Sequence, residues 1–458
     1  MKRKYYSLYL LIFLFVACQK QEQWLEARTN IASVVPSSLK DYSAIMDADF
    51  LVRSYGFLAI LGTDHIYLTD ADYNAAFNGP EKNGFIWAKD VYESFTSISE
   101  WNGMYQKIAM SNICLEGLEK LTVRNNELPE WNRVKGTALF FRAFCYYQML
   151  QHFAVPYEAA SAQTDLGVPL RLSADVNIKL GRSSVKDCYD QVRSDLTQAI
   201  ALLPAQTAVK TRPTKAAAES LLARVYLMLE QWDQAEKHAA MALATQSTLI
   251  DFNTLNAAAT IAFPTLQVGH AEVIFYAESS SSSYYGGNRP LFDSTLYRSY
   301  VNNDLRRTVF FRLFNGLPIF KGFYTGLATP PFSGIATNEL YLIRAEALAR
   351  QGLKDQAMGV LNSLLIKRWR NGTYIPLTAV DAGDALVKII TERKKELPLT
   401  GSLVWEDLRR LNKDPRFART LRKRVNGVFY ELPPKDPRYV LPIPDIEIKL
   451  SGIPQNIR

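Results

Sequence analysis

Two segments far apart in the chain carry the same helical pattern, and this repeat limits the possible folds more than any other feature. The first copy begins near residue 214 and has the small and apolar spacing of a tetratricopeptide helix pair at Leu222, Tyr226, Trp232, Ala235, Ala239, Ala242 and Leu243. The second copy consists of Leu348, Gly352, Ala357, Leu361 and Leu365, and Gly352 should end its first helix. Ala235 and Ala357 lie 122 positions apart, whereas tandem repeats recur about every 34 residues. A large segment is therefore inserted between the two copies.

This arrangement predicts a mostly α-helical protein with an interrupted scaffold. Tetratricopeptide-like helix pairs should form the scaffold over about 90–245 and 336–412. A large irregular, loop-rich lobe should occupy about 250–335, and a second irregular, aromatic-rich stretch covers 56–92. We expect residues 41–458 to form a single domain, with helices over 130–153 and 185–203 that are apolar at helical spacing.

The N-terminus has the pattern of an exported lipoprotein. Three cationic residues precede an apolar run over 5–17, which is long enough for a secretory signal and too short to span a bilayer. The run ends in Phe15, Val16, Ala17 and Cys18, which resembles a bacterial lipobox in which the cysteine is acylated. We predict a signal peptide over 1–17, lipidation of Cys18, and a polar tether over 18–40.

Composition argues against several function classes. The formal charge of +8 includes the cationic N-terminus, and basic residues are interleaved with acidic ones along the helices. This balance is typical of solvated helix faces and does not indicate nucleic-acid binding. Cys114, Cys145 and Cys188 lie among apolar neighbours, so they are buried thiols, or two of them form a disulfide. Their spacing predicts no metal site.

The sequence also lacks a catalytic constellation. The four histidines (His65, His152, His238 and His270) are far apart, and no zincin, nucleophile-elbow or Walker motif is present. Paired carboxylates could come from distant segments, but most acidic residues lie on amphipathic helix faces. We therefore expect a binding protein rather than an enzyme, with no cofactor and no metal.

Aromatic and polar residues on irregular segments are the candidates for ligand binding. Aromatic rings stack on the apolar faces of sugars, while Asp, Asn and Arg hydrogen-bond the hydroxyls. The first cluster consists of Asp64, Tyr67, Tyr73, Phe77 and Trp87. The second consists of Tyr284, Tyr285, Asn288, Arg289 and Phe292, beside a serine- and glycine-rich stretch. The alternative for each ring is packing beneath its own loop.

Four segments together resemble the SusD/RagB family of outer-membrane lipoproteins. Residues 338–368 resemble the family's C-terminal helix pair, and 135–144 resemble its A-x-x-L-R-A-x-x-Y helix. Residues 392–397, followed by Gly401, Trp405 and 407–410, look like its E-R-R-x-E-L…G…W…D-L-R-R element, although one extra residue lies between Gly401 and Asp407. We interpret this element as a structural junction whose charges pair internally. Residues 439–448, with Gln455 and Asn456, are similar to the closing PIP…EI…QN signature.

The resemblance implies a lipid-anchored, cell-surface component of a nutrient-uptake system for polysaccharide utilization. Family members cover a partner TonB-dependent, SusC-like transporter in the outer membrane and deliver captured oligosaccharides to it. The RagB branch captures peptides instead, and the sequence does not separate the two cargo classes. A third hypothesis is a structural adaptor that binds protein through its helical repeats. The basic balance favours acidic cargo only weakly.

Overall fold

The computed structural model describes residues 35–76, 79–282, 284 and 291–458. Cys18, the signal peptide and the tether up to residue 34 lie outside the described residues, as do four candidate ligand-binding residues: Phe77, Tyr285, Asn288 and Arg289. Within the described ranges, every helix is too short or too polar to cross a membrane.

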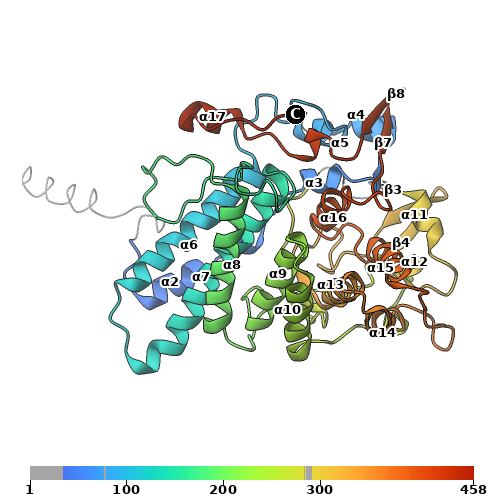
Figure 1. Ribbon diagram of the computed structural model, residues 1–458, viewed down its shortest axis with the longest axis horizontal. Coiled ribbons are helices and arrows are strands. Elements are labelled where there is room, and N and C mark those ends of the chain that lie inside the picture. The colour runs from blue at the N-terminus through green and yellow to red at the C-terminus, as the bar shows by residue number, and fades with distance from the viewer. Residues whose placement is uncertain (1–34, 77–78, 283, 285–290) are drawn as a thin grey trace, which may run out of the picture.

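Antiparallel helices form the scaffold and run side by side across the molecule (Figure 1). The first part begins with α2 (Leu39–Met46), α6 (Met104–Glu119), α7 (Leu128–Phe153) and α8 (Val185–Leu202), and continues with α9 (Lys215–Met228) and α10 (Trp232–Thr245). The second part consists of α13 (Thr337–Arg350), α14 (Lys354–Leu365), α15 (Ala382–Glu396) and α16 (Leu403–Leu411). The predicted mostly helical, tetratricopeptide-like fold is confirmed.

The two repeat copies pack against each other although the insertion separates them in sequence. Helix α10 contacts both α9 and α13, so the two helix pairs are continuous in space. Ala235 and Ala357 are fully buried, and such small side chains allow helix axes to approach closely. Gly352 follows α13 with a φ of +82°, a left-handed conformation that glycine adopts without strain. Its predicted role at the end of that helix is confirmed.

The insertion contributes short strands and helices rather than a regular layer. It contains β2 (Val273–Phe275), β3 (Leu291–Phe292), α11 (Ser294–Ser299), α12 (Arg306–Val309), β4 (Phe311–Phe314), β5 (Leu317–Phe320) and β6 (Ile335–Ala336). Strand β1 (Ile66–Tyr67) joins β3, β5 and β4 in an antiparallel sheet of order β1-β3-β5-β4. Because β1 belongs to the irregular stretch at 56–92, this sheet ties the two irregular segments together.

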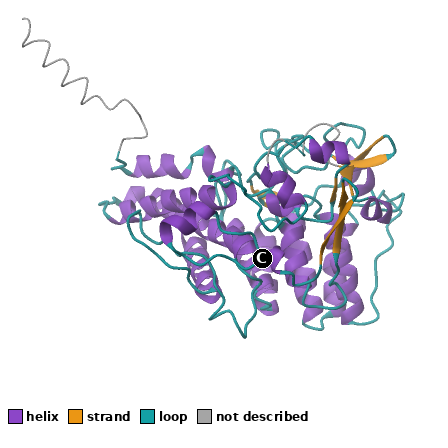
Figure 2. Ribbon diagram, turned by 90° about the horizontal axis from the view of Figure 1, so that it is seen from above, coloured by secondary structure: helices purple, strands orange, loops and turns teal. Residues whose placement is uncertain are grey.

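The strands gather at one end of the molecule (Figure 2), and smaller elements from the early chain and the C-terminal segment lie along its upper side in Figure 1. The early chain forms η2 (Asp49–Val52), α3 (Leu58–Leu61), α4 (Asp70–Asn74), α5 (Gly79–Phe85) and the π-helical turn η3 (Ser99–Gly103). The C-terminal segment forms the hairpin β7 (Leu421–Val425) and β8 (Val428–Leu432), then α17 (Asp445–Ser451). Side-chain pairing between Asn74 and Asn426 joins α4 to the hairpin.

The core is continuous under the scaffold. Helix α7 is buried on all sides along its second half, where Phe140, Phe144 and Tyr147 are fully enclosed. Cys114, Cys145 and Cys188 are buried free thiols, and burial raises the pKa of each thiol above its usual range. The prediction that these three cysteines are buried thiols is therefore confirmed, and no pair of them forms a disulfide.

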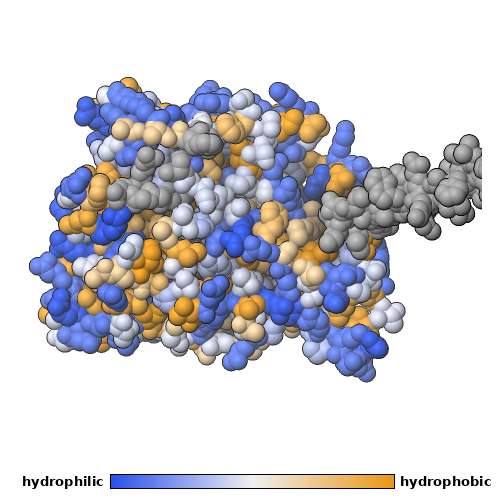
Figure 3. Space-filling model, turned by 180° about the vertical axis from the view of Figure 1, so that it is seen from behind, coloured by the Kyte–Doolittle hydropathy of each residue, from blue (hydrophilic) through white to orange (hydrophobic). Residues whose placement is uncertain are grey.

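Apolar side chains are dispersed on the face seen in Figure 3. They form small groups separated by hydrophilic residues. Single exposed apolar side chains are normal on a soluble surface, so this pattern alone marks no interface.

Candidate functional site

The structure brings the two predicted ligand-binding clusters together. Ile66 and Tyr67 pair with Phe292 and Leu291 between β1 and β3. The Tyr284 hydroxyl donates a hydrogen bond to the carbonyl oxygen of Tyr73 at 3.3 Å. Segments more than 200 positions apart therefore share one small aromatic core.

Most of these residues are packed in buried apolar clusters rather than on a binding surface: Tyr284 and Phe292 in this core, and Trp87 in a separate cluster with Trp405. Trp87, Tyr284 and Phe292 are at most 2% exposed. The Trp87 indole donates to the carbonyl oxygen of Gly62 at 2.8 Å, which satisfies its only polar group. These three side chains cannot reach a ligand from the surface in this conformation, because neighbouring segments cover them. For these three rings, the structure therefore shows packing beneath loops, the alternative to ligand binding.

The carboxylate of Asp64 is also engaged, in ion pairs with two basic residues. Its carboxylate lies 2.9 Å from the Arg419 guanidinium and 3.4 Å from the Lys394 ammonium. Burial would raise the pKa of Asp64, but these two cations outweigh it and hold that pKa well below its usual range. Of the described members of the two clusters, Tyr67 is half exposed and Tyr73 is partly buried. Only these two rings remain accessible.

A different surface pocket combines exposed rings with free polar groups. It has a volume of about 390 Å³ and lies where η2, the loop before η3 and the first turn of α6 meet. We call it the Phe50–Phe95 pocket after its two exposed phenyl rings, which are 37% and 45% exposed. Phe57 lines the same pocket and is partly buried.

Five neutral polar side chains also line the pocket. Ser99 donates a hydrogen bond to Glu100 at 3.0 Å, and the other four are Ser54, Ser97, Asn102 and Gln106. Within the described residues, neither the two serine hydroxyls nor the Gln106 amide makes a side-chain hydrogen bond, and Asn102 uses only its oxygen, which accepts from the Ile98 amide at 2.8 Å. These groups are free to exchange hydrogen bonds with a polar ligand.

Local backbone contacts hold this arrangement. Glu100 is the one charged residue that lines the pocket, and it is 1% exposed. Its carboxylate accepts from the backbone amides of Phe57 at 2.9 Å and Leu58 at 3.0 Å, so it fixes the segment after η2 against η3. The Ser280 hydroxyl donates to Ser99 at 3.0 Å, so the insertion supports the same wall.

The pocket continues into a second hollow across η3. This neighbour has a volume of about 590 Å³ and shares Asn102 and Gln106 with the first. Its other walls come from the loop at 176–180 and from α17, where Glu447 and Leu450 contribute. The two hollows therefore adjoin at Asn102 and Gln106.

The sequence analysis missed this site, although one signal was available. Phe95 lies between polar residues (Glu93, Ser94, Thr96 and Ser97), a context in which a large ring seldom packs inward. The predicted irregular stretch ended at residue 92, three residues before it. Phe50 gives no such signal, because Phe50, Leu51 and Val52 form a continuous apolar run.

Comparisons with known proteins give a family match over the first part of the chain. Residues 27–227 match a SusD-like family model described as starch-binding and associating with the outer membrane. No curated protein matches the chain. The predicted resemblance to the SusD/RagB family is therefore confirmed over these residues.

Solved structures extend the SusD-like fold over nearly the whole chain. A putative sugar-binding protein from Bacteroides vulgatus is 20% identical, with a TM-score of 0.74 over 93% of this chain and 99% of that one. A SusD superfamily protein from Bacteroides thetaiotaomicron is 21% identical, with a TM-score of 0.72 over 92% of this chain and 100% of that one. One from Bacteroides fragilis is 20% identical, with a TM-score of 0.72 over 92% and 99%.

The SusD-like motifs lie at structural junctions. Asp407 accepts from Arg393 at 2.7 Å and from Arg410 at 2.8 Å, and Arg410 also holds buried Glu346 through two bonds of 2.6 and 2.8 Å. The charges of this element therefore pair internally, as predicted. In the closing motif, the Asn456 amide donates to the carbonyl oxygen of Phe153 at 2.9 Å, so it attaches the C-terminal segment to the end of α7.

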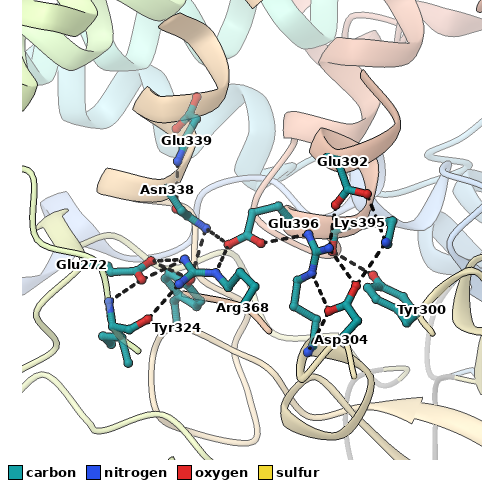
Figure 4. Close-up of polar contacts among 12 residues, drawn as sticks. Glu272, Tyr300, Asp304, Tyr324, Asn338, Glu339, Arg368, Glu392, Lys395 and Glu396 are labelled. Atoms are coloured by element: carbon teal, nitrogen blue, oxygen red, sulfur yellow. Dashed lines mark hydrogen bonds and ion pairs between the residues drawn. The ribbon is translucent and has the colours of Figure 1, made fainter. Parts of the chain in front are cut away.

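A second buried junction joins the SusD-like scaffold to its insertion (Figure 4). Arg368 contacts Glu272 and Glu396, each at 2.8 Å, and both carboxylates are completely buried. The Tyr324 hydroxyl donates to Glu272 at 2.8 Å. Lys395 lies 3.1 Å from Asp304 on the other side of the junction. The expectation that charged residues lie on solvated faces is wrong here, because the insertion covers them.

The charged groups of this junction stabilise the contact between the scaffold and the insertion, and they are not arranged as a general acid and base. Burial raises the pKa of Glu272, and Arg368 opposes that rise. Burial would raise the pKa of Asp304, but the Arg306 guanidinium outweighs it and lowers that pKa. Glu272, Glu396 and Asp304 each already contact an arginine, so none is poised to exchange a proton with a substrate.

Proposed function

We propose that this protein captures oligosaccharides at the cell surface in the Phe50–Phe95 pocket. The observation that carries the proposal is the combination, in one pocket, of two exposed rings with four neutral polar side chains that are free to hydrogen-bond. Flat aromatic faces stack on the C–H faces of sugars, and serine, asparagine and glutamine exchange hydrogen bonds with hydroxyl groups. The neighbouring hollow supports binding of a chain of sugars rather than a single one.

The match of residues 27–227 to a family described as associating with the outer membrane supports the rest of the proposal. An acyl group on Cys18 would anchor the protein there, and the segment up to about residue 40 would act as its tether. The partner would be a TonB-dependent, SusC-like transporter that receives the captured oligosaccharide. A short tether keeps the two at high effective concentration, so release and recapture would favour transfer over loss to the medium.

Binding without chemical change fits the pocket better than hydrolysis does. A glycosidase needs two carboxyl groups that flank the scissile bond. The pocket contributes one carboxylate, Glu100, and two backbone amides occupy one of its oxygens. We therefore propose no enzymatic activity for this site.

The proposal is tested by calorimetry against a panel of oligosaccharides, with the double variant Phe50→Ala/Phe95→Ala. We expect the wild-type protein to bind at least one member of the panel and the double variant to bind it at least tenfold more weakly. Phe429→Ala is the matched control, because Phe429 is 71% exposed on β8, outside the pocket. Equal affinity of the double variant and the control would refute the site.

Two further measurements address the alternatives. If the same rings bind peptides but not oligosaccharides, the cargo is a peptide, as in the RagB branch, and the proposed oligosaccharide cargo is wrong. Purification from cells of a complex that lacks any TonB-dependent transporter would contradict the proposed partner. A wild-type protein that binds neither sugar nor peptide would favour the structural adaptor.

A further inference from the structure

A buried lysine without a partner lies beneath the Phe50–Phe95 pocket. Lys107 is in the first turns of α6 and its side chain is 0% exposed. Within the described part of the chain, its ammonium makes no hydrogen bond and no ion pair. An ammonium buried in this way is costly, because it has given up its hydration without receiving an acceptor. Such a group usually marks a function or a missing ligand.

Among the described residues, two aromatic rings lie against this charge. The Lys107 ammonium lies 4.3 Å from the centroid of the Phe50 ring and 4.9 Å from that of the Tyr55 ring. A cation over a ring face is attracted by the ring's quadrupole, but more weakly than by a carboxylate. Burial lowers the pKa of Lys107 below its usual range, and no carboxylate counteracts that change.

Two residues that line the pocket also lie close to the ammonium. Phe50, whose ring lies over the ammonium, lines the pocket and is 37% exposed. Gly103 also lines the pocket and has no side chain; a Cβ there would lie 3.9 Å from the Lys107 nitrogen.

We propose that Lys107 makes this pocket select oligosaccharides that carry a carboxylate, such as those that contain uronic acids. The inference rests on the proposed function, since it names the class of sugar that the same pocket takes. The carboxylate would form an ion pair with the ammonium after the Phe50 ring rotates aside. Phe50 lies in a four-residue 3-10 helix, and a partly exposed ring can change rotamer without disturbing the core.

The neutral lining of the pocket fits such a ligand. Asn102, Gln106 and the serines would bind the hydroxyl groups. An acidic sugar and its neutral counterpart carry most of these hydroxyl groups at the same positions. Only the carboxylate would reach Lys107. The lining would therefore supply affinity for sugars in general, and the buried cation would supply the discrimination.

The first experiment compares matched sugars by saturation-transfer NMR. The probes are galacturonate with galactose, and glucuronate with glucose. We expect the wild-type protein to bind each uronate at least tenfold more tightly than its neutral counterpart. Lys107→Met should abolish that preference and keep the binding of the neutral sugars. The control Lys237→Met removes a lysine that is exposed on α10, outside the pocket, and should retain the preference.

The second experiment measures the reactivity of Lys107 toward an acetylating reagent, with the modified lysines located by mass spectrometry. We expect slow modification in the wild-type protein, faster modification in Phe50→Ala, and protection of that variant by galacturonate. This measurement does not depend on the folding of a Lys107 variant.

Each outcome separates this inference from the proposed function. If oligosaccharide binding depends on Phe50 and Phe95 but neither uronate is preferred, or Lys107→Met keeps the preference, the inference is wrong and the proposed function stands. If no sugar depends on those rings, the proposed function itself fails. A preference for peptides with a free carboxylate over both uronates would also overturn the inference.

Discussion

His270 provides a test of how burial affects this protein's response to acid. Its ring stacks on Phe263 with 5.4 Å between centroids and lies 4.6 Å from the ring of Tyr324. Both ring nitrogens are buried without a hydrogen-bond partner among the described residues. Burial, with a smaller effect from the Arg368 charge, lowers the pKa of His270 from 6.5 to about 3.

The direction of the pH dependence follows from this lowered pKa. The unfolded chain binds a proton near pH 6.5 and the folded protein does not, so the free energy of unfolding falls as the pH falls below 6.5. The loss continues until the folded-state pKa near 3 is reached. Between pH 7.5 and 5.5, His270 alone should lower the free energy of unfolding by about 1.4 kcal/mol.

Urea denaturation of the wild-type protein and of His270→Phe, at both pH values, checks this magnitude. Phenylalanine keeps the stacking and removes the titrating group. His65 and His152, whose pKa values burial also lowers to about 3, affect both proteins equally. We expect the wild-type protein to lose about 1.4 kcal/mol more than the variant on acidification. Equal losses would refute the account of His270 as a buried neutral histidine.

Two further substitutions test the junction and the aromatic core. Arg368→Met should lower the free energy of unfolding by about 3–5 kcal/mol in urea, because it leaves buried Glu272 without its cation and removes one of the two arginines that contact buried Glu396. Arg422→Met, which breaks a pair exposed on β7, should change it by less than about 1 kcal/mol, and similar losses for the two arginine variants would contradict this reasoning. Tyr284→Ala should cost roughly 3–5 kcal/mol, since the ring is fully buried, whereas Tyr67→Ala should be nearly neutral; an unchanged melting temperature for Tyr284→Ala would place that ring outside the core.

The parts of the fold that local patterns encode were predictable. Ala235, Ala239 and Ala357 recur at helical spacing, and Gly352 interrupts the second copy where its first helix ends. The charges around Asp407 also follow from sequence, because an acidic residue three positions before an arginine is suited to pairing within one helical turn, and the preceding helix ends in basic residues.

The candidate site was only partly predictable, since exposure depends on which distant segment covers a ring. Trp87 and Tyr284 lie in irregular, polar surroundings, as a surface ring would, yet their neighbours in space enclose them. Phe50 lies in an apolar run, as a core ring would, yet it is exposed. The sequence analysis therefore predicted buried loop rings as surface rings and overlooked the exposed ring of Phe50.

The sequence by itself determined the helical scaffold, its interruption and the resemblance to SusD-like proteins, because hydrophobic periodicity and ordered motifs are properties of the chain read locally. Only the tertiary structure decided which aromatic rings face solvent, and that Lys107 lies unpaired between Phe50 and Tyr55 beneath a pocket. The physical reason is that burial and charge pairing depend on contacts between segments that are distant in sequence. In this protein the insertion and the early loops make those contacts, and no local pattern records them.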